Sequence, residues 1–127
     1  MKFNSLIPEL TVTNIEESKK FYQNIGFKIM YERKENKFCF LQLEENQIMI
    51  EEQNDNWNVG KMKYPFGRGI NISMSISDVE KMYKELKKNI EMFLELEIHE
   101  YKVNNQIYKD KEFLIQDPDG YLLRFNN

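Results

Sequence analysis

The chain has 127 residues, of which 41% are hydrophobic and 31% charged, and its formal net charge at pH 7 is −3. This length suffices for one compact domain with its own core. A weakly acidic balance argues against nucleic acid, which requires a basic face, and the lack of a sustained apolar run argues against a membrane span. Cys39 is the only cysteine, so we expect no disulfide and a cytoplasmic location. The N-terminal stretch MKFNSLIPEL has no sustained apolar run, so we expect no secretory signal.

The first half of the chain predicts a strand, a helix and three further strands. Residues 6–13 alternate between the two faces of a strand. A helix should follow with Thr13 or Asn14 as its N-cap, because a glutamate lies three residues after each. Gly26 ends that helix, and the runs FKIMYER, KFCFLQL and QIMIEE read as strands. A polar turn at residues 44–46 joins the last two.

The second half predicts the same elements. Residues 70–77 alternate more regularly than the first strand. A helix should begin after Ser77 or Asp78, and Ser77 with Glu80 has the spacing of a capping box. The run LELEIHEYKV and a closing hairpin follow. The hairpin turn is DPDG, in which Gly120 can adopt a left-handed φ at no steric cost.

The two halves repeat one pattern at a shift of 64 positions, which places Asn14 (position 14) on Asp78 (position 78). We therefore predict an α+β fold made of two βαβββ modules. The expected single domain covers 1–127, with modules 1–55 and 69–127 and a linker, rich in aromatic side chains, at 56–68.

This organisation, with NIEESKKFY and IGF in the first half and QDPDGYLLRF at the end, resembles the vicinal oxygen chelate superfamily. That superfamily includes glyoxalases, extradiol dioxygenases and bleomycin-resistance proteins. The resemblance covers nearly the whole chain. It implies that each module curls into a cup, that paired cups enclose a cavity and that the helices cover the outer sheet faces.

Metal-dependent members of the superfamily hold their ion with a His on the first strand, an acidic residue on the fourth, a His on the fifth and a Glu on the last. The resemblance assigns these positions to Ile7, Glu51 or Glu52, Asn71 and Arg124. Ile7 donates no ligand, and Arg124 carries the wrong charge. The sole histidine, His99, lies on a different strand. We therefore expect no metal and no cofactor.

Arg124 should point away from the core, because Leu123 and Phe125 beside it occupy the opposite strand face. A cation inside a cup requires a carboxylate partner, and the candidates are Glu9, Glu51 and Glu52. Two interpretations remain open. Arg124 forms a structural salt bridge at the cavity rim or a dimer seam, or it anchors an anionic or carbonyl-bearing ligand through two parallel hydrogen bonds.

Within the superfamily the chain is most similar to bleomycin-resistance proteins, which lack the metal ligands and some of which carry an arginine in the pattern DPDG-x-LLR. That resemblance implies a homodimer that sequesters a planar, cationic compound without catalysing a reaction. Such a compound would stack on aromatic rings and prefer an acidic rim. The expected ligand-binding residues are Phe38, Phe40, Trp57, Tyr64, Phe66, Tyr108, Glu9, Glu51, Asn71 and Arg124.

Several of these residues have a second interpretation. Phe38 and Phe40 share one strand face and are also candidates for the core. Trp57 lies in a polar, asparagine-rich stretch, where a core position is hard to explain, so it is a candidate for a binding site or a dimer contact. Cys39 alternates away from Phe38 and Phe40 and has no neighbouring base, so we interpret it as a small buried hydrophobe.

Three functions follow, in order of preference. The first is a metal-free protein that binds bleomycin or another planar small molecule. The second is an isomerase-like or lyase-like enzyme that uses Glu9, Glu51 or Glu52 as a base beside Arg124. The third is residual metal-dependent glyoxalase or dioxygenase chemistry through Glu51, with Glu9 and Asn71 as further ligands. No nucleic acid or membrane partner is expected.

Overall fold

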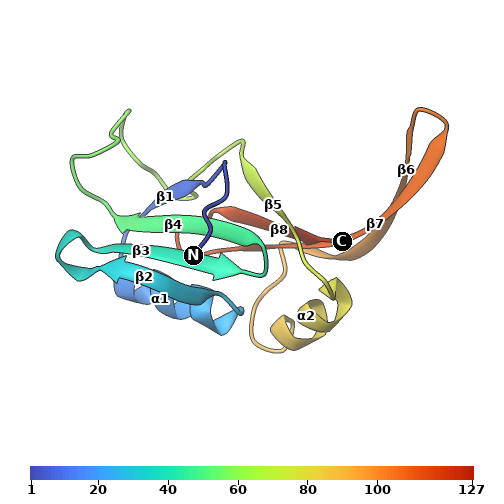
Figure 1. The fold of residues 1–127 in the computed structure, drawn as a ribbon, viewed down its shortest axis with the longest axis horizontal. Helices are drawn as coiled ribbons and strands as arrows, with labels where there is room; N and C mark the ends of the chain where they lie inside the picture. Colours follow the sequence, from blue (N-terminus) through green and yellow to red (C-terminus); the bar gives the residue numbers. More distant parts are fainter. The chain divides into compact units, whose positions relative to one another are not determined.

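The computed structural model describes residues 1–127 and divides into two compact units. The first unit consists of Met1–Phe66 and Asp117–Asp119, and the second of Gly67–Gln116 and Gly120–Asn127. Each unit contains one α-helix and one four-stranded mixed sheet (Figure 1). The predicted α+β fold of two βαβββ modules is therefore confirmed. No helix has both the length and the apolar character needed to cross a membrane.

The sheet of the first unit has the strand order β1-β4-β3-β2. Only β1 and β4 are parallel, and the other neighbours are antiparallel. The helix lies along one face of this sheet (Figure 1). The elements are β1 (Glu9–Val12), α1 (Ile15–Asn24), β2 (Lys28–Arg33), the short 3-10 helix η1 (Lys34–Asn36), β3 (Phe38–Leu43) and β4 (Asn46–Glu52).

The first strand is shorter than the alternation of residues 6–13 predicts. It begins at Glu9, because Pro8 has no N–H to donate to a sheet ladder. The segment before it is held by a side chain instead. Gln47 accepts a hydrogen bond from the Asn4 backbone N–H at 2.7 Å and donates one to the Lys2 carbonyl at 2.7 Å.

The two faces of the first sheet differ in chemistry. The helix-covered face supplies the core of the unit, with Leu10, Val12, Cys39, Leu41, Ile48 and Ile50 all buried. The opposite face carries Glu9, Thr11, Phe38, Phe40, Met49 and Glu51, which the strand register aligns with one another. Alternation therefore assigns these residues correctly to their faces.

The second unit repeats the connectivity of the first, with the strand order β5-β8-β7-β6. The β5–β8 pair is parallel, like β1–β4. The elements are β5 (Asn71–Ser75), α2 (Val79–Leu86), β6 (Leu94–Val103), β7 (Gln106–Gln116) and β8 (Leu122–Asn126). The internal repeat predicted from the sequence is thereby confirmed.

Both helices begin at equivalent residues of the repeat. The Asn14 side chain accepts a hydrogen bond from the Glu17 N–H at 3.1 Å, and the Asp78 side chain accepts one from the Lys81 N–H at 3.1 Å. The capping box predicted for Ser77 is wrong, because Asp78 occupies the N-cap. Its carboxylate at a helix N-terminus also interacts favourably with the helix dipole.

The closing hairpin has the predicted DPDG turn. The Asp117 carboxylate accepts a hydrogen bond from the Asp119 N–H at 2.9 Å, and Gly120 has a φ of +93°. Residues 117–119 belong to the first unit because their partners lie there. The buried Tyr22 hydroxyl donates to Asp117 Oδ2 at 2.7 Å, and the Thr13 N–H donates to Asp119 Oδ2 at 3.1 Å.

Candidate functional site

The open face of the first sheet combines acidic and aromatic side chains, and we refer to it as the acidic–aromatic face. Its members are Glu9 on β1, Tyr31 on β2, Phe38 and Phe40 on β3, Glu51 on β4 and Trp57 in the loop after β4. Five of these six were predicted from the sequence as ligand-binding residues. The sequence interpretation missed Tyr31.

Glu9 and Glu51 form the acidic part of this face. Glu9 aligns with Met49 and Thr11 aligns with Glu51 across the parallel pair β1–β4, so the two glutamates are diagonal neighbours on one side of the sheet. Partial burial, followed by the negative charge of Glu51 and a hydrogen bond between the two side chains, raises the pKa of Glu9. Two neighbouring carboxylates repel each other when both are ionised, so a cation placed between them is favoured.

Trp57 completes the acidic part from the loop. Its side chain lies close enough to Glu9 to oppose the rise in the Glu9 pKa. Trp57 remains 76% exposed, and its φ is +56°, which is uncommon for a bulky residue. The indole ring is therefore beside Glu9 and open to solvent.

The phenylalanines of this face are already packed. Phe38 is 5% exposed and Phe40 is 1% exposed. The Arg33 guanidinium lies 4.2 Å from the centroid of the Phe38 ring, a cation–π distance. Phe40 stacks on Tyr31 at 5.2 Å and meets the exposed Phe3 edge-on at 5.4 Å. Trp57 is thus open to a ligand, whereas Phe38 and Phe40 are buried and already have packing partners.

A β-bulge places Tyr31 on this face. The register of β2 against β3 shifts between Ile29 and Tyr31, so that Ile29 pairs with Leu41 whereas Tyr31 pairs with Phe40. Plain alternation from the half-buried Ile29 would have assigned Tyr31 to the helix side. An extra residue in one strand reverses the faces of all that follow it.

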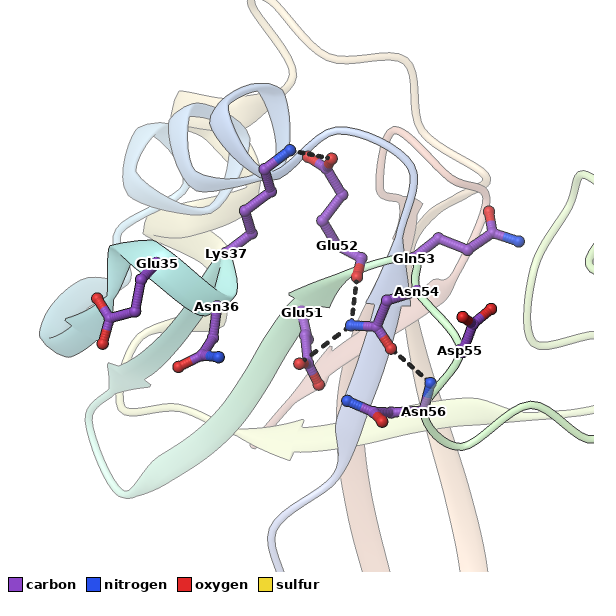
Figure 2. Close-up of a pocket in the computed structure, with 9 residues that line it drawn as sticks. All are labelled: Glu35, Asn36, Lys37, Glu51, Glu52, Gln53, Asn54, Asp55 and Asn56. Carbon is purple, nitrogen blue, oxygen red and sulfur yellow. Dashed lines mark hydrogen bonds and ion pairs between the residues drawn. The ribbon is translucent and has the colours of Figure 1, made fainter.

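A polar cavity of about 450 Å³ adjoins Glu51 (Figure 2). It is lined by Glu35 and Asn36 of η1 and by Lys37 on one side, and by residues 51–56 on the other. The Asn54 amide donates to Glu51 Oε1 at 3.2 Å and to the Glu52 carbonyl at 3.1 Å. These bonds orient the Glu51 carboxylate at the edge of the cavity.

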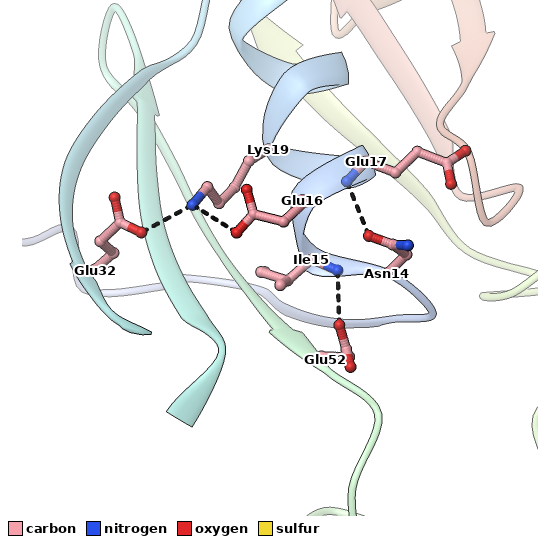
Figure 3. Close-up of polar contacts among 7 residues, drawn as sticks. All are labelled: Asn14, Ile15, Glu16, Glu17, Lys19, Glu32 and Glu52. Carbon is pink, nitrogen blue, oxygen red and sulfur yellow. Dashed lines mark hydrogen bonds and ion pairs between the residues drawn. The ribbon is translucent and has the colours of Figure 1, made fainter. Parts of the chain in front are cut away.

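Glu52 does not share the role of Glu51. Its Oε2 accepts a hydrogen bond from the Ile15 N–H at 3.0 Å, at the N-terminus of α1 (Figure 3). Its Oε1 pairs with Lys37 at 3.1 Å (Figure 2). The backbone hydrogen bond, and then the lysine, lower the pKa of Glu52. The expectation that Glu52 serves as a base or metal ligand is therefore wrong, because its carboxylate stabilises a helix end.

Cys39 and Lys19 lie on the helix-covered side, and the predicted burial of Cys39 is confirmed. Cys39 is fully buried, and burial raises the pKa of its thiol to about 11. Lys19 of α1 pairs with Glu32 at 2.9 Å and Glu16 at 3.2 Å (Figure 3). Neither group faces the acidic–aromatic face.

The second unit has its own open face, which we call the ionic groove. It has a volume of about 630 Å³ and is lined by Ser73, His99, Tyr101, Asp110, Glu112, Arg124, Asn126 and Asn127. Arg124 points away from the buried Leu123 and Phe125, as predicted. Its carboxylate partner is Glu112, with Nε and Oε2 2.5 Å apart, and not one of the three glutamates expected from the sequence.

The remaining predicted residues lie in several places. Asn71 is exposed at the start of β5, and Tyr108 is on the β6–β7 hairpin, stacked on Tyr101 at 5.6 Å. Tyr64 is exposed in the segment before the second unit. Phe66 is buried, and its N–H donates to the Asp119 carbonyl at 2.8 Å.

The register also identifies the residue that corresponds to the fourth-strand ligand of metal-dependent relatives. Glu9 pairs with Met49 in the first sheet, and Ser73, its counterpart at the shift of 64, pairs with Arg124 in the second. Met49 therefore takes the position that matches Arg124, in place of Glu51 or Glu52. The resulting set, Ile7, Met49, Asn71 and Arg124, does not fit a divalent metal. No group of three or more His, Cys, Asp or Glu side chains could hold one elsewhere.

Comparisons with known proteins agree with this fold. The sequence model of the Glyoxalase/Bleomycin resistance protein/Dioxygenase superfamily matches residues 3–125. A solved member from Vibrio splendidus 12B01 is 30% identical, with 93% of each chain covered and a TM-score of 0.45. A glyoxalase/bleomycin resistance protein/dioxygenase from Alicyclobacillus acidocaldarius is 20% identical over 97% of this chain and 89% of that chain, with a TM-score of 0.67.

The chain is also similar to a bleomycin resistance determinant encoded on the transposon Tn5. The identity is 17%, 98% of each chain is covered and the TM-score is 0.68. At such identities the likeness concerns the fold alone. No curated protein sequence matches the chain.

Proposed function

Since the chain belongs to the Glyoxalase/Bleomycin resistance protein/Dioxygenase superfamily, we propose that it is a small-molecule binding protein of the bleomycin-resistance type. The ligand would be a planar compound with a cationic group, held on the acidic–aromatic face. The ring system would stack on Trp57, and the cation would be held by Glu9 and Glu51. The protein would sequester this compound without changing it.

The observation that carries the proposal is the position of the exposed Trp57 beside Glu9, with Glu51 diagonal to Glu9 on the same sheet face. It brings an exposed aromatic ring next to two carboxylates that repel each other when both are ionised. A cation between these carboxylates removes the repulsion. A planar ligand with one cationic arm meets both requirements at once, since it offers an aromatic face to the indole and a charge to the acids.

We also propose that the binding form is a homodimer. Trp57 is 76% exposed, and a drug-sized ligand needs most of its surface covered. A second copy of the chain would supply that cover. Sedimentation equilibrium with and without ligand tests this part, and a monomer at saturating ligand would contradict it.

The sole tryptophan provides a direct test of binding. Metal-free bleomycin is titrated into the protein while Trp57 fluorescence and the heat of binding are recorded. We expect saturation at about one drug per chain, and we expect Glu51→Gln to weaken binding by at least tenfold. Glu45→Gln, in the exposed turn between β3 and β4, is the matched control and should bind as the unmodified protein does. No heat and no fluorescence change at tens of micromolar would remove bleomycin as the ligand.

A second candidate function is favoured by the raised pKa of Glu9. A carboxyl with a raised pKa is a stronger base when ionised, and can take a proton from a carbon acid, as in an isomerase or lyase that acts on a carbonyl compound. The test is incorporation of deuterium from the solvent into simple aldehydes and keto acids, followed by proton NMR. Exchange that Glu9→Gln abolishes would favour an enzyme over a sequestering protein.

A further inference from the structure

The ionic groove of the second unit is organised around one buried carboxylate. The Glu112 side chain is 8% exposed. Its Oε2 accepts the hydrogen bond from Arg124 Nε at 2.5 Å, and its Oε1 lies 3.2 Å from His99 Nε2. Each carboxylate oxygen of Glu112 therefore has a partner, Arg124 or His99. Glu112 holds these two groove-lining side chains in position.

This arrangement leaves the outer edge of the Arg124 guanidinium available. The hydrogen bond to Glu112 uses Nε, and the two Nη groups make no hydrogen bond to the protein. Those Nη groups carry four N–H donors in one plane, which matches the two oxygens of a carboxylate. Ser73 lies directly across the strand pair from Arg124, and its hydroxyl can donate to the same ligand oxygen.

Asp110 supplies the opposite charge at the other end of the groove. It is half-buried, it aligns with His99 across β6–β7, and it makes no hydrogen bond or ion pair. Tyr101 lines the groove beside it and is stacked on Tyr108. A carboxylate next to tyrosine rings is a favourable environment for an ammonium group.

The strand register separates the two charges. Arg124 aligns with Leu114 on β7. Asp110 lies four positions before Leu114 on the same strand, so the Cα atoms of Leu114 and Asp110 are about 13 Å apart. The arginine side chain shortens this gap because it extends back toward Glu112. A ligand that reaches both charges must therefore be elongated.

We propose that the ionic groove binds a small zwitterion, with its carboxylate on the Arg124 Nη groups and its ammonium on Asp110. The Arg124 Nη groups offer donors to a carboxylate, and Asp110 offers a negative charge to an ammonium. Only a molecule that carries both groups contacts both ends. The residues of this site all belong to the second unit.

The sole histidine reports on the groove. The imidazole proton signals of His99 are followed by NMR, at fixed pH and ionic strength, during titration with glycine, 4-aminobutyrate and 6-aminohexanoate. Acetate and propylammonium chloride are titrated separately. We expect saturable shifts with the longer zwitterions and none with the two single-charged ions. Shifts of equal size with acetate, or no saturable shift with any zwitterion, would overturn the proposal.

Two substitutions assign the ends of the groove. Arg124→Gln and Asp110→Asn should each weaken zwitterion binding by at least tenfold. Asp110→Asn removes a charge that has no partner in the protein, so it leaves folding intact even if Arg124→Gln does not. Lys109→Gln, on the same hairpin but paired with Glu100, is the control and should not change the affinity. Unchanged binding by Asp110→Asn would refute the assignment of the ammonium site.

The two proposed sites can fail independently. Trp57 fluorescence reports on the acidic–aromatic face, and the His99 signals report on the ionic groove. Loss of the bleomycin response with a retained zwitterion response would contradict the proposed function alone.

Discussion

Glu9 and Glu51 are diagonal neighbours on one face of the parallel strands β1 and β4, and the negative charge of Glu51 helps burial to raise the pKa of Glu9. The parallel register, rather than proximity in the chain, brings them together. Their position beside the exposed Trp57 distinguishes this face from the rest of the first unit.

Substitution of Glu51 by Gln should lower the pKa of Glu9. The amide removes the second negative charge and can donate a hydrogen bond to the Glu9 carboxylate, while the effect of burial persists. NMR titration of the glutamate side-chain carboxyl carbons measures this shift, with Glu45→Gln as the control. An unchanged Glu9 pKa would show that the two groups do not interact.

The raised pKa of Glu9 predicts how the stability of the protein changes with pH. The folded-state pKa of Glu9 lies above its ordinary value of 4.5, so the folded protein holds that proton more tightly than the unfolded chain. Stability should therefore fall as pH rises from 4.5 through the raised pKa. Urea denaturation across this range should show a smaller fall for Glu51→Gln than for the unmodified protein.

Loss of the Glu52 side chain should destabilise the first unit. Glu52→Ala removes the acceptor for the Ile15 N–H at the start of α1, at a cost of about 1 kcal/mol at neutral pH. Glu52→Gln should cost less, because its amide oxygen can still accept that bond. The folded pKa of Glu52 is lowered, so its contribution is present above 4.5 and is lost as pH falls through that lowered value. Denaturant unfolding of Glu52→Ala should therefore approach that of the unmodified protein in acid, and a pH-independent difference would contradict this.

Removal of one hydroxyl should loosen the DPDG turn from the first unit. Tyr22→Phe deletes the buried donor to Asp117 Oδ2. Since a buried carboxylate then loses a hydrogen bond, we expect a loss of roughly 1–3 kcal/mol in the free energy of unfolding. Tyr83→Phe, whose hydroxyl contacts the exposed Glu95, is the matched control and should unfold close to the unmodified protein. Equal effects of the two substitutions would argue against this role of Asp117.

Two glycines allow steric clash to be separated from backbone strain. Gly67 and Gly69 have φ values of +71° and +85°, but only a Cβ at Gly67 would meet the Tyr121 ring, at 2.6 Å. Gly69→Ala should cost about 1–2 kcal/mol through its left-handed φ. Gly67→Ala should cost roughly 1–3 kcal/mol more, because the ring must move. Thermal unfolding of both variants measures the difference, and equal melting temperatures would show that Tyr121 yields freely.

Much of the fold follows from local patterns in the sequence. The alternation of Glu9 with Leu10 and of Phe38 with Cys39 assigned each side chain to its sheet face, because a strand has a period of two. The N-cap Asn14 and the turn glycine Gly120 were identified for a similarly local reason. Each satisfies the backbone within a few residues of itself, so no distant partner is needed.

Other features depended on pairing between segments far apart in the chain. The bulge that turns Tyr31 toward Phe40 exists only in the pairing of β2 with β3. Glu52 follows Glu51 directly, yet it reaches α1 rather than the open face. The alternation of Phe113 and Ile115 did carry a signal for Glu112, since it places Glu112 on the same strand face as Arg124 across the final hairpin.

The sequence by itself determined the two βαβββ modules, the face of most strand residues and the mismatch of Ile7 and Arg124 with metal ligation. Tertiary structure decided which charges meet: Glu9 with Glu51, and Arg124 with Glu112. Periodicity defines the side of a strand on which a residue lies. The partner of a charge depends on strand order and register, which arise only when segments distant in the chain pair within one sheet.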